Sequence, residues 1–355
     1  MAATMTSHER FRRMYAHQEA DRIPVMDSPW TETIQRWRDE GMPDMDYTRY
    51  FDLDQVASIW TDNSPHLPEA ILEETDEYVI RTTAWGATTR TFKKHTTTPE
   101  HLGFQVTTPD AWRKIRDRIA ASDDNIPWDY IRKNYKTWRE EGRWIIGNLW
   151  FGFDITHSYM VGTENLLMAM LEEPEWVMEM FERELDVSLS QLERVWDAGY
   201  TFDEVHWPDD MGYKGTQFFS LDLYRTLLKP FQKRAVEWGH QHGCVVRLHS
   251  CGDIRPFVPE LAEIGMDGLN PLEVKAGMDP VALKREFGDK MLFHGGINAV
   301  NWDKTDVILD EIERVVPAMK ENGGYIFASD HSIPPHVSFK NFTQIIEKVK
   351  QVGKY

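Results

Sequence analysis

The 355-residue chain contains only two cysteines, Cys244 and Cys251, and they flank a predicted buried strand. The two ends of such a strand lie roughly 20 Å apart, which is too far for a disulfide. We therefore expect both thiols to be reduced and the protein to be cytoplasmic.

Long apolar runs are also missing, since no segment approaches the ~20 apolar residues that span a bilayer. Residues 1–13 are polar and charged, and they lack the apolar stretch of a secretory signal. Basic side chains are scarce, because 40 Lys and Arg against 58 Asp and Glu give a formal net charge of −18. That charge argues against nucleic acids and anionic membranes as partners, since both attract basic surfaces.

Apolar and aromatic side chains, by contrast, are plentiful. Hydrophobic residues make up 41% of the chain, which is enough for one large α/β barrel or for two medium-sized domains. Most of the 14 tryptophans are expected in the core, and a few near strand ends could line a pocket for a flat or apolar ligand.

Strand-like and helix-like segments alternate along most of the chain. No G-x-G-x-x-G motif follows a predicted strand, which weighs against a doubly wound sheet as the alternative. Eight strands, mostly followed by helices, predict an α/β fold of the (β/α)8, or TIM-barrel, type. The predicted strands are 22–26, 55–60, 144–149, 202–206, 245–249, 268–272, 291–294 and 325–328.

Two β-rich runs around Gly86 predict a β-hairpin at about 74–93, inserted after the second strand. No low-complexity linker interrupts the chain. We therefore predict a single TIM-barrel domain over 1–355 that carries this insertion.

The segment 245–253, VVRLHSCGD, carries the clearest functional signal. His249 and Cys251 are two positions apart at a strand end, and alternate residues of an extended segment point to the same side. Active sites of barrels collect at the carboxyl ends of the strands. Imidazole and thiolate suit zinc, and three protein ligands with one open position form a catalytic zinc site. We therefore predict a metal at His249 and Cys251, and we expect Cys244 in the core.

Most of the other predicted strands also end in acidic, histidine or amide side chains, which favours a polar site at this rim. A structural interpretation exists as well, because Asp209 and Asp210 could simply cap a loop. Two adjacent acids are nevertheless costly to bury unless they are hydrated, paired or metal-bound. The residues at or just after strand ends are Asp27, Asp62, Tyr159, His206, Trp207, Asp209, Asp210, Asn270, Glu273, His294, Asp330 and His331.

These residues resemble the uroporphyrinogen decarboxylase superfamily, which contains the decarboxylase and zinc-dependent methyltransferases that act with corrinoid proteins. The likeness covers essentially the whole chain, and the His-x-Cys-Gly element at 249–252 is its most specific part. It implies a (β/α)8 barrel. The matching segments are DRIPV at 21–25, LHSCGD at 248–253, GIN at 296–298 and SDHSIPP at 329–335.

The decarboxylase branch has an arginine-rich M-R-Q-A-G-R segment after the first strand, which holds substrate carboxylates. Here that place reads MDSPWT at 26–31, so both arginines are missing and Asp27 has appeared. Asp62, Tyr159 and His331 do fall at positions that resemble the decarboxylase. In a metal-free decarboxylase, the alternative function, Asp62 would stabilise a protonated pyrrole-like intermediate, and Tyr159 and His331 would orient it.

In the methyltransferase branch the His-x-Cys pair binds zinc, and the third ligand is commonly a cysteine after the last strand. Here His331 occupies that place, with Asp330 beside it. The resemblance therefore leaves the third ligand open among His331, Asp330 and Glu273.

The sequence thus predicts a zinc-dependent methyltransferase that moves a methyl group between a small methylated substrate or a thiol and the corrinoid of a partner protein. A non-catalytic small-molecule binder is a second alternative, and a homodimer is left open. The expected catalytic residues are Asp62, Tyr159, Asp209 and Asp210, the substrate-binding residues Asp27, His206, Trp207, Asn270 and Asp330, and the metal ligands His249, Cys251, His331 and Glu273.

Overall fold

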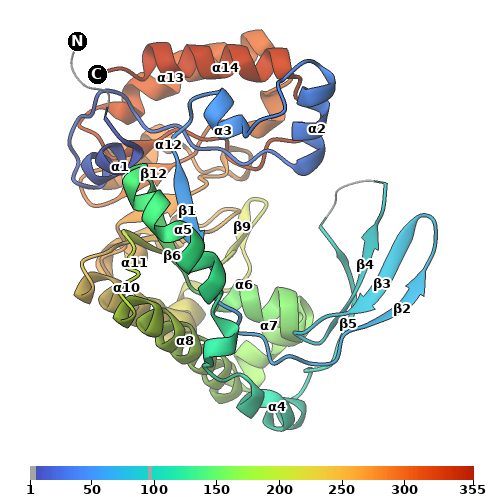
Figure 1. The fold of residues 1–355 in the computed structure, drawn as a ribbon. Helices are drawn as coiled ribbons and strands as arrows, with labels where there is room; N and C mark the ends of the chain where they lie inside the picture. Colours follow the sequence, from blue (N-terminus) through green and yellow to red (C-terminus); the bar gives the residue numbers. More distant parts are fainter. Residues whose placement is uncertain (1–4, 95–97) are drawn as a thin grey trace.

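A curled parallel β-sheet of seven strands forms the centre of the molecule in the computed structural model, which describes residues 5–94 and 98–355 (Figure 1). All neighbouring strands in this sheet pair in parallel. In sheet order the strands are β1 (Val56–Ile59), β6 (Trp144–Asn148), β7 (Glu204–Pro208), β10 (Val245–His249), β11 (Gly268–Asn270), β12 (Leu292–His294) and β13 (Tyr325–Ile326). Each of these strands overlaps a predicted one.

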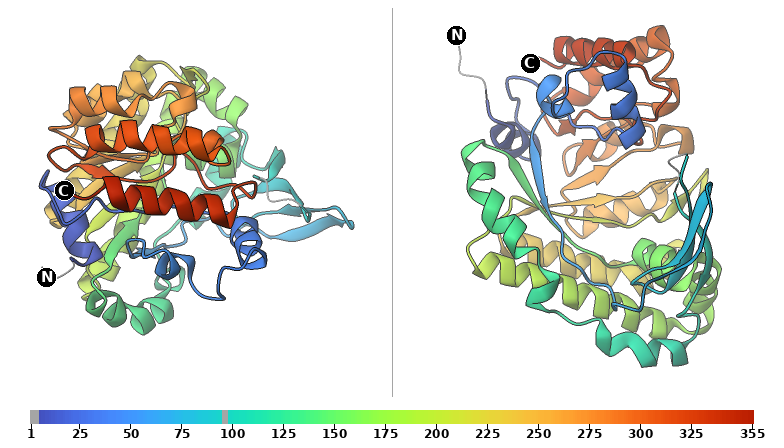
Figure 2. Two further views of the ribbon diagram at one scale, coloured as in Figure 1. Left: turned by 90° about the horizontal axis from the view of Figure 1, so that it is seen from above. Right: turned by 45° about the vertical axis from the view of Figure 1, so that its right-hand side comes forward.

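Helices lie along the outside of this sheet (Figure 2). The longest, α8 (Pro174–Asp197), begins with proline at its first position, where the missing amide hydrogen costs nothing, and buries an apolar stripe. The other α-helices are α1 (Ser7–Tyr15), α2 (Thr31–Asp39), α3 (Tyr47–Tyr50), α4 (Pro109–Ile115), α5 (Trp128–Glu140), α6 (Phe153–Ile155), α7 (Thr163–Glu172), α9 (Leu221–Leu223), α10 (Lys229–Gln241), α11 (Val258–Glu263), α12 (Pro280–Phe287), α13 (Thr305–Lys320) and α14 (Phe339–Val352). No helix within the described residues combines the length and apolar character that crossing a bilayer requires.

The first predicted strand, 22–26, is not a regular strand. Val25 makes one parallel bridge to Phe327, just beyond β13, and Pro29 makes another to Ile333. The proline at position 24 removes one backbone donor, so the segment cannot form a complete ladder. The strand prediction was therefore wrong in detail, although the segment does lie beside the β13 end of the sheet.

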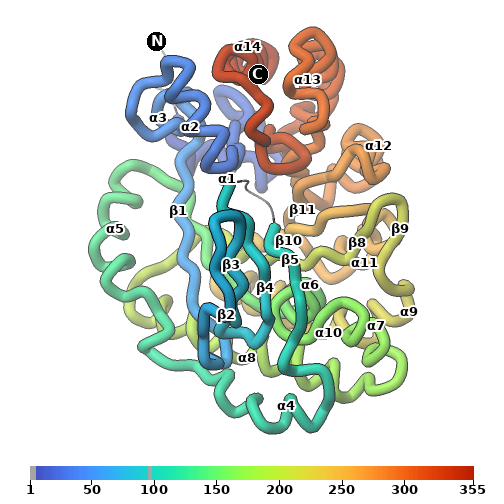
Figure 3. The backbone as a smooth tube through the Cα atoms, turned by 90° about the vertical axis from the view of Figure 1, so that its right-hand side faces the viewer, coloured from blue at the N-terminus to red at the C-terminus, as the bar shows by residue number. Residues whose placement is uncertain are grey.

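A separate antiparallel sheet of four strands follows β1, in the region where the sequence predicts a hairpin at about 74–93. It consists of β2 (Ala70–Glu74), β3 (Tyr78–Thr82), β4 (Ala87–Phe92) and β5 (Glu100–Phe104). Figure 1 shows it standing out from one side of the body, and Figure 3 looks directly onto it. The predicted range covers only part of this larger element.

A small hairpin of β8 (Gly212–Tyr213) and β9 (Thr216–Gln217) follows β7 and packs against residues 251–253, just after β10. The helical segment after β9 consists of α9 and α10, and they are not directly continuous. Residues Tyr224–Leu228 between them form a π-helical turn.

Alternation along β10 separates the core from the site. Val246 and Leu248 are fully buried in the main apolar core of the protein. Arg247 and His249 point to the other side, where they line a polar pocket. The remaining strands are also short and largely buried, so their polar ends lie close together at one rim.

Candidate functional site

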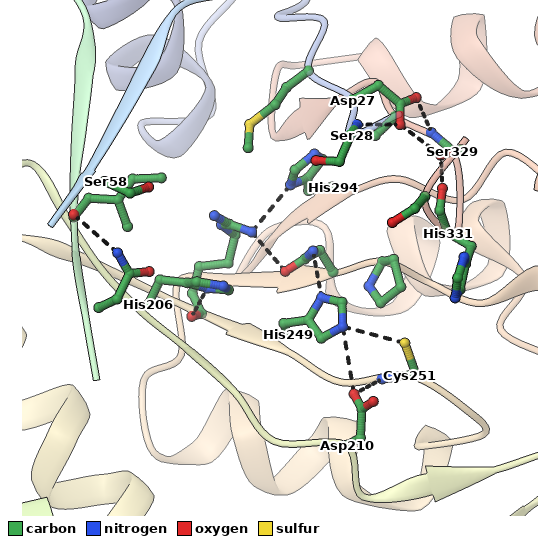
Figure 4. A pocket seen from close by; sticks show the side chains of 18 of the residues that line it. Asp27, Ser28, Ser58, His206, Asp210, His249, Cys251, His294, Ser329 and His331 are labelled. Atoms are coloured by element: carbon green, nitrogen blue, oxygen red, sulfur yellow. Dashed lines mark hydrogen bonds and ion pairs between the residues drawn. The ribbon is translucent and has the colours of Figure 1, made fainter. Parts of the chain in front are cut away.

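A polar pocket of about 440 Å³ opens at the carboxyl ends of the parallel strands. Such a volume lies within the ordinary range for a small-molecule site. Figure 4 shows polar side chains entering it from several strands and loops. Its lining consists of Met26, Asp27, Ser28, Ser58, Trp60, Ile146, Asn148, His206, Asp210, Arg247, His249, Cys251, Asn270, Pro271, His294, Ala328, Ser329, His331 and Ser332.

Three side chains of different chemistry converge in this pocket: Asp210, His249 and Cys251. One ligand atom from each lies within 4.8 Å of the other two. Nε2 of His249 is 3.4 Å from the Cys251 sulfur and 3.6 Å from a carboxylate oxygen of Asp210. The side chains of His249 and Cys251 therefore face one way, as the alternation of an extended segment predicts.

The loops that carry these groups are fixed by backbone contacts. The amide of Cys251 donates to Asp210 at 2.7 Å, so the carboxylate is held beside the loop that bears the thiol. Gly252 follows with a positive φ of 80°, and a Cβ there would meet the backbone of Gly212 at 2.2 Å. Glycine is required at this position because the β8–β9 hairpin packs directly against the loop.

A buried hydrogen-bond chain orients the imidazole of His249. Its Nδ1 lies 3.0 Å from the amide nitrogen of Asn270, and the amide oxygen of Asn270 accepts from Arg247 at 2.7 Å. Arg247 is 3% exposed, and its Nη2 lies 2.7 Å from a carboxylate oxygen of Glu204, which is fully buried. Nε2 of His249 is consequently the nitrogen turned toward Cys251 and Asp210.

Burial is the main cause of the pKa shifts of Cys251, Asp210 and His249. It raises the pKa of the Cys251 thiol well above its usual value, and the charge of Asp210 adds to the effect. Burial also raises the pKa of Asp210 and lowers the pKa of His249. A cation at this point would favour the thiolate and the carboxylate, because it stabilises both anions.

Two further histidines of the pocket are neutral. Burial, followed by the charge of Arg247, lowers the pKa of His206 and of His294 well below the usual value. Asp27 lies on the same wall as Ser329. Burial favours its uncharged form too and raises its pKa to about 6, although Ser329 and Ser28 donate hydrogen bonds to it.

A family model described as uroporphyrinogen decarboxylase (URO-D) matches residues 117–352, which include every strand of the pocket except β1. The chain belongs to the uroporphyrinogen decarboxylase family. None of the curated proteins matches the sequence.

Solved structures place this family member among parallel α/β folds. A methyltransferase from Methanosarcina mazei is 16% identical, with 98% of this chain and 99% of that chain covered and a TM-score of 0.66. More distant are a putative vitamin-B12 independent methionine synthase from Listeria monocytogenes (10% identity, 66% and 71% covered, TM-score 0.40) and a xylanase from Gloeophyllum trabeum (8%, 64% and 82%, TM-score 0.41). At 16% identity the similarity to the Methanosarcina mazei protein concerns the fold alone.

The donor set of the pocket fits zinc, which the family resemblance implies. Imidazole nitrogen, thiolate sulfur and carboxylate oxygen are all zinc ligands, and three protein donors are typical of catalytic zinc sites. The structure brings Asp210 beside His249 and Cys251 as a candidate third donor, whereas the sequence assigned Asp210 to catalysis. His331 lines the same pocket but does not belong to the group of three.

The other two candidate ligands have structural partners. Glu273 accepts from the amide of Gly252 at 2.6 Å and pairs with Lys275 at 3.1 Å. Asp330 accepts from the amides of Val274 and Ala299 at 2.9 and 2.7 Å. Both carboxylates brace the loops around the pocket, and neither is among its lining residues.

Asp209 and Trp207 point away from the pocket and into the protein. Asp209 is fully buried, where it accepts from the amide of Asp154 and from Gln232, and burial raises its pKa to about 8. Trp207 is also fully buried, in the main core. By contrast, the predicted substrate-binding residues Asp27, His206 and Asn270 do line the pocket.

Asp62 and Tyr159 lie outside this pocket. Asp62 lines a second cavity beside it, and Tyr159 packs edge-on against Trp150 with ring centroids 5.8 Å apart.

Sequence reasoning missed Arg247, which lines the main pocket. The available signal was a charged residue in the middle of an apolar strand, two positions before His249, because such a charge requires a buried partner.

Proposed function

We propose that this protein is a zinc-dependent methyltransferase that moves a methyl group between a small methylated substrate or a thiol and a corrinoid carried by a partner protein. The observation that carries the proposal is the convergence of Asp210, His249 and Cys251 in a polar pocket at the strand ends. Family membership and the fold shared with the Methanosarcina mazei methyltransferase support it.

In this proposal Asp210, His249 and Cys251 hold the metal, with His331 as the nearest alternative donor on the pocket wall. When bound, zinc supplies Lewis acidity, which lowers the pKa of a thiol or hydroxyl or polarises a substrate oxygen. Asn270 lies against Nδ1 of the imidazole, and the amide of Cys251 holds the carboxylate of Asp210.

Other lining residues are placed to bind the substrate. His206 and His294 are neutral, so each can accept or donate a hydrogen bond without adding charge. Asp27, with its pKa of about 6, changes charge near neutral pH. Together they suit a small polar molecule.

We also propose that residues 22–29 complete a (β/α)8 barrel and that the chain forms one domain.

The decarboxylase alternative finds less support in the pocket. Arg247 is the only arginine among the described lining residues, and Glu204 already neutralises it at 2.7 Å. A substrate with many carboxylates would therefore meet no free cation, and it would meet Asp27 instead. Asp62, the expected stabiliser of a pyrrole cation, does not line this pocket.

Metal content tests the proposal directly. We expect the protein, loaded with zinc and then dialysed, to retain about one zinc per chain, as one such site requires. Cys251→Ala should lose most of it, whereas the matched variant Cys244→Ala should not, because Cys244 is buried in the core. Equal zinc in the wild type and Cys251→Ala would end the zinc assignment.

Activity is tested separately with cob(I)alamin and small methylated ethers, amines or thiols, by following methylcobalamin in the visible spectrum. Formation that requires Cys251 supports the methyltransferase. Conversion of uroporphyrinogen to coproporphyrinogen without metal would favour the decarboxylase instead. Binding of a small molecule that is unchanged in the double variant His249→Ala, Cys251→Ala, without turnover of any donor, would favour the non-catalytic binder.

A further inference from the structure

A second cavity, of about 420 Å³, lies beside the polar pocket and shares Trp60 with it. We call it the aromatic slot. Its lining consists of Trp60, Thr61, Asp62, Asn63, Trp85, Asp124, Asn125, Ile126, Pro127 and Trp150.

Three tryptophans from separate segments form the walls of the slot. Trp60 follows β1, Trp150 follows β6, and Trp85 occupies the turn between β3 and β4. The rings of Trp60 and Trp150 are tilted with centroids 4.9 Å apart. Tyr159 braces two of them, with its ring 5.8 Å from Trp150 and 6.1 Å from Trp85. The antiparallel sheet β2–β5 thus contributes one wall of a site on the barrel side.

The charges along the slot are negative. Asp62 has half of its side chain exposed, and its nearest ionisable partner is His66 at 3.7 Å. Asp124 is exposed and forms no ion pair within the described residues, because Arg194 pairs with its neighbour Asp123 at 3.0 Å. No lysine or arginine is among the described residues that line the slot.

Two polar groups of the slot have no partner. The hydroxyl of Thr61 and the side-chain oxygen of Asn63 are buried, and neither forms a hydrogen bond within the described structure. Buried polar atoms normally have a partner in the protein, in water or in a ligand. Both atoms are closed off from the cavity as well as from solvent, so the rings and the carboxylates are the groups that a ligand in the slot would meet.

We propose that the aromatic slot binds the alkylated ammonium group of a small molecule. The face of an indole ring is electron-rich and attracts cations, and quaternary ammonium ions are characteristically bound by several aromatic rings. The carboxylates of Asp62 and Asp124 add long-range attraction, as does the net charge of −18. A neutral flat ligand would use the rings but gain nothing from the acids, and an anion would be repelled.

This site contains none of the three metal-binding candidates, so its occupancy can be tested without zinc and without turnover. Choline is the probe, and 3,3-dimethylbutan-1-ol, which has the same shape without the charge, is its control. We expect titration calorimetry on the full chain to show choline binding at least roughly 10-fold more tightly than the neutral alcohol, since several rings contribute.

Substitutions in and outside the slot test where choline binds. Trp85→Leu and Asp62→Asn should each weaken choline binding by roughly 2- to 30-fold, whereas Asp76→Asn, in the β2–β3 turn, should leave it unchanged. Equal affinity for choline and the alcohol would overturn the proposal, because the slot would then recognise shape alone. The absence of choline binding would also overturn the proposal, as would a choline affinity that does not change in Trp85→Leu and Asp62→Asn. Each result is independent of whether the protein transfers methyl groups.

Discussion

Asn270 places its amide nitrogen 3.0 Å from Nδ1 of His249, so it is a donor that faces this ring nitrogen. Arg247 fixes that orientation by donating to the amide oxygen of Asn270 at 2.7 Å. A metal on Nε2 requires the opposite arrangement, since Nδ1 then carries the hydrogen and needs an acceptor. Zinc binding must therefore turn the Asn270 amide and weaken its contact with Arg247.

Asn270→Asp should consequently raise the affinity for zinc. A carboxylate can accept from Arg247 with one oxygen and from Nδ1 of His249 with the other, so no reorientation is needed. Outer-shell partners of this kind change metal affinity by roughly 10- to 100-fold, and we expect an increase of about 10-fold. Competition with a chromophoric chelator at constant pH measures it.

The matched control is Ser28→Asp, which adds the same charge to the same pocket without a contact to His249. It should change zinc affinity far less. Asn270→Leu, which offers His249 no acceptor, should lower the affinity. Weaker zinc binding by Asn270→Asp than by the wild type would contradict the orientation argument.

The identity of the third metal donor gives a second prediction. Asp210→Ala should reduce zinc affinity on the order of 100-fold or more, because it removes a donor that lies with His249 and Cys251. His331→Ala should have a smaller effect, since His331 only lines the pocket wall. The reverse ranking, measured by the same competition assay, would make His331 the third ligand, which is one of the three that the sequence resemblance leaves open.

The order of the parallel strands could be predicted from the sequence because the strands are short and mostly apolar, and helices alternate with most of them. The segment around Val25 could not be recognised as irregular, since its apolar pattern matches a strand and only Pro24 argues otherwise. The sheet β2–β5 was seen only in part, because its outer strand β2 is wholly exposed and lacks an inward-facing apolar pattern.

Within the site, His249 and Cys251 could be predicted because their shared direction follows from strand alternation alone. The sequence could not show which of the two adjacent acids, Asp209 or Asp210, faces the pocket. Asp209 turns inward to Gln232 and Asp210 turns outward to Cys251, and this choice depends on loop contacts with other elements. The positions of Glu273 and Asp330 behind the pocket wall could not be predicted for the same reason, since backbone amides that are distant in sequence donate to them.

Asp209 gives a third prediction, which concerns stability and pH. Its pKa is raised by burial to about 8, far above the ordinary aspartate value, so the folded protein holds a proton that the unfolded chain releases. Stability therefore falls as the pH rises from about 4 to about 8, by at most about 1.4 kcal/mol per pH unit from this group.

Asp209→Asn removes this pH-dependent contribution, because an amide does not titrate. Its oxygen can still accept from the amide of Asp154, and Gln232 must turn its own amide to remain in contact. We expect the free energy of unfolding of the wild type, relative to that of the variant, to decline between these pH values and then to level off. Urea denaturation at several pH values measures the difference. Parallel pH profiles for the two proteins would show that Asp209 is ionised in the fold.

The buried pair of Arg247 and Glu204 gives the last prediction. Arg247 donates from Nε to Glu204 at 2.7 Å, and the second oxygen of Glu204 accepts from Trp144 and Tyr15. Arg247→Met should reduce the free energy of unfolding by about 3–5 kcal/mol, because it leaves the Glu204 charge buried without a partner. Adding Glu204→Gln should recover much of that loss, since the uncompensated charge disappears while an acceptor for Trp144 and Tyr15 is kept.

The control is Arg234→Met, which breaks a surface contact with Asp186. Its free energy of unfolding should stay within roughly 1 kcal/mol of the wild type in the same urea titrations. Strictly additive losses for the two substitutions would mean that the pair is not coupled, and Arg247 would then support the pocket through packing alone.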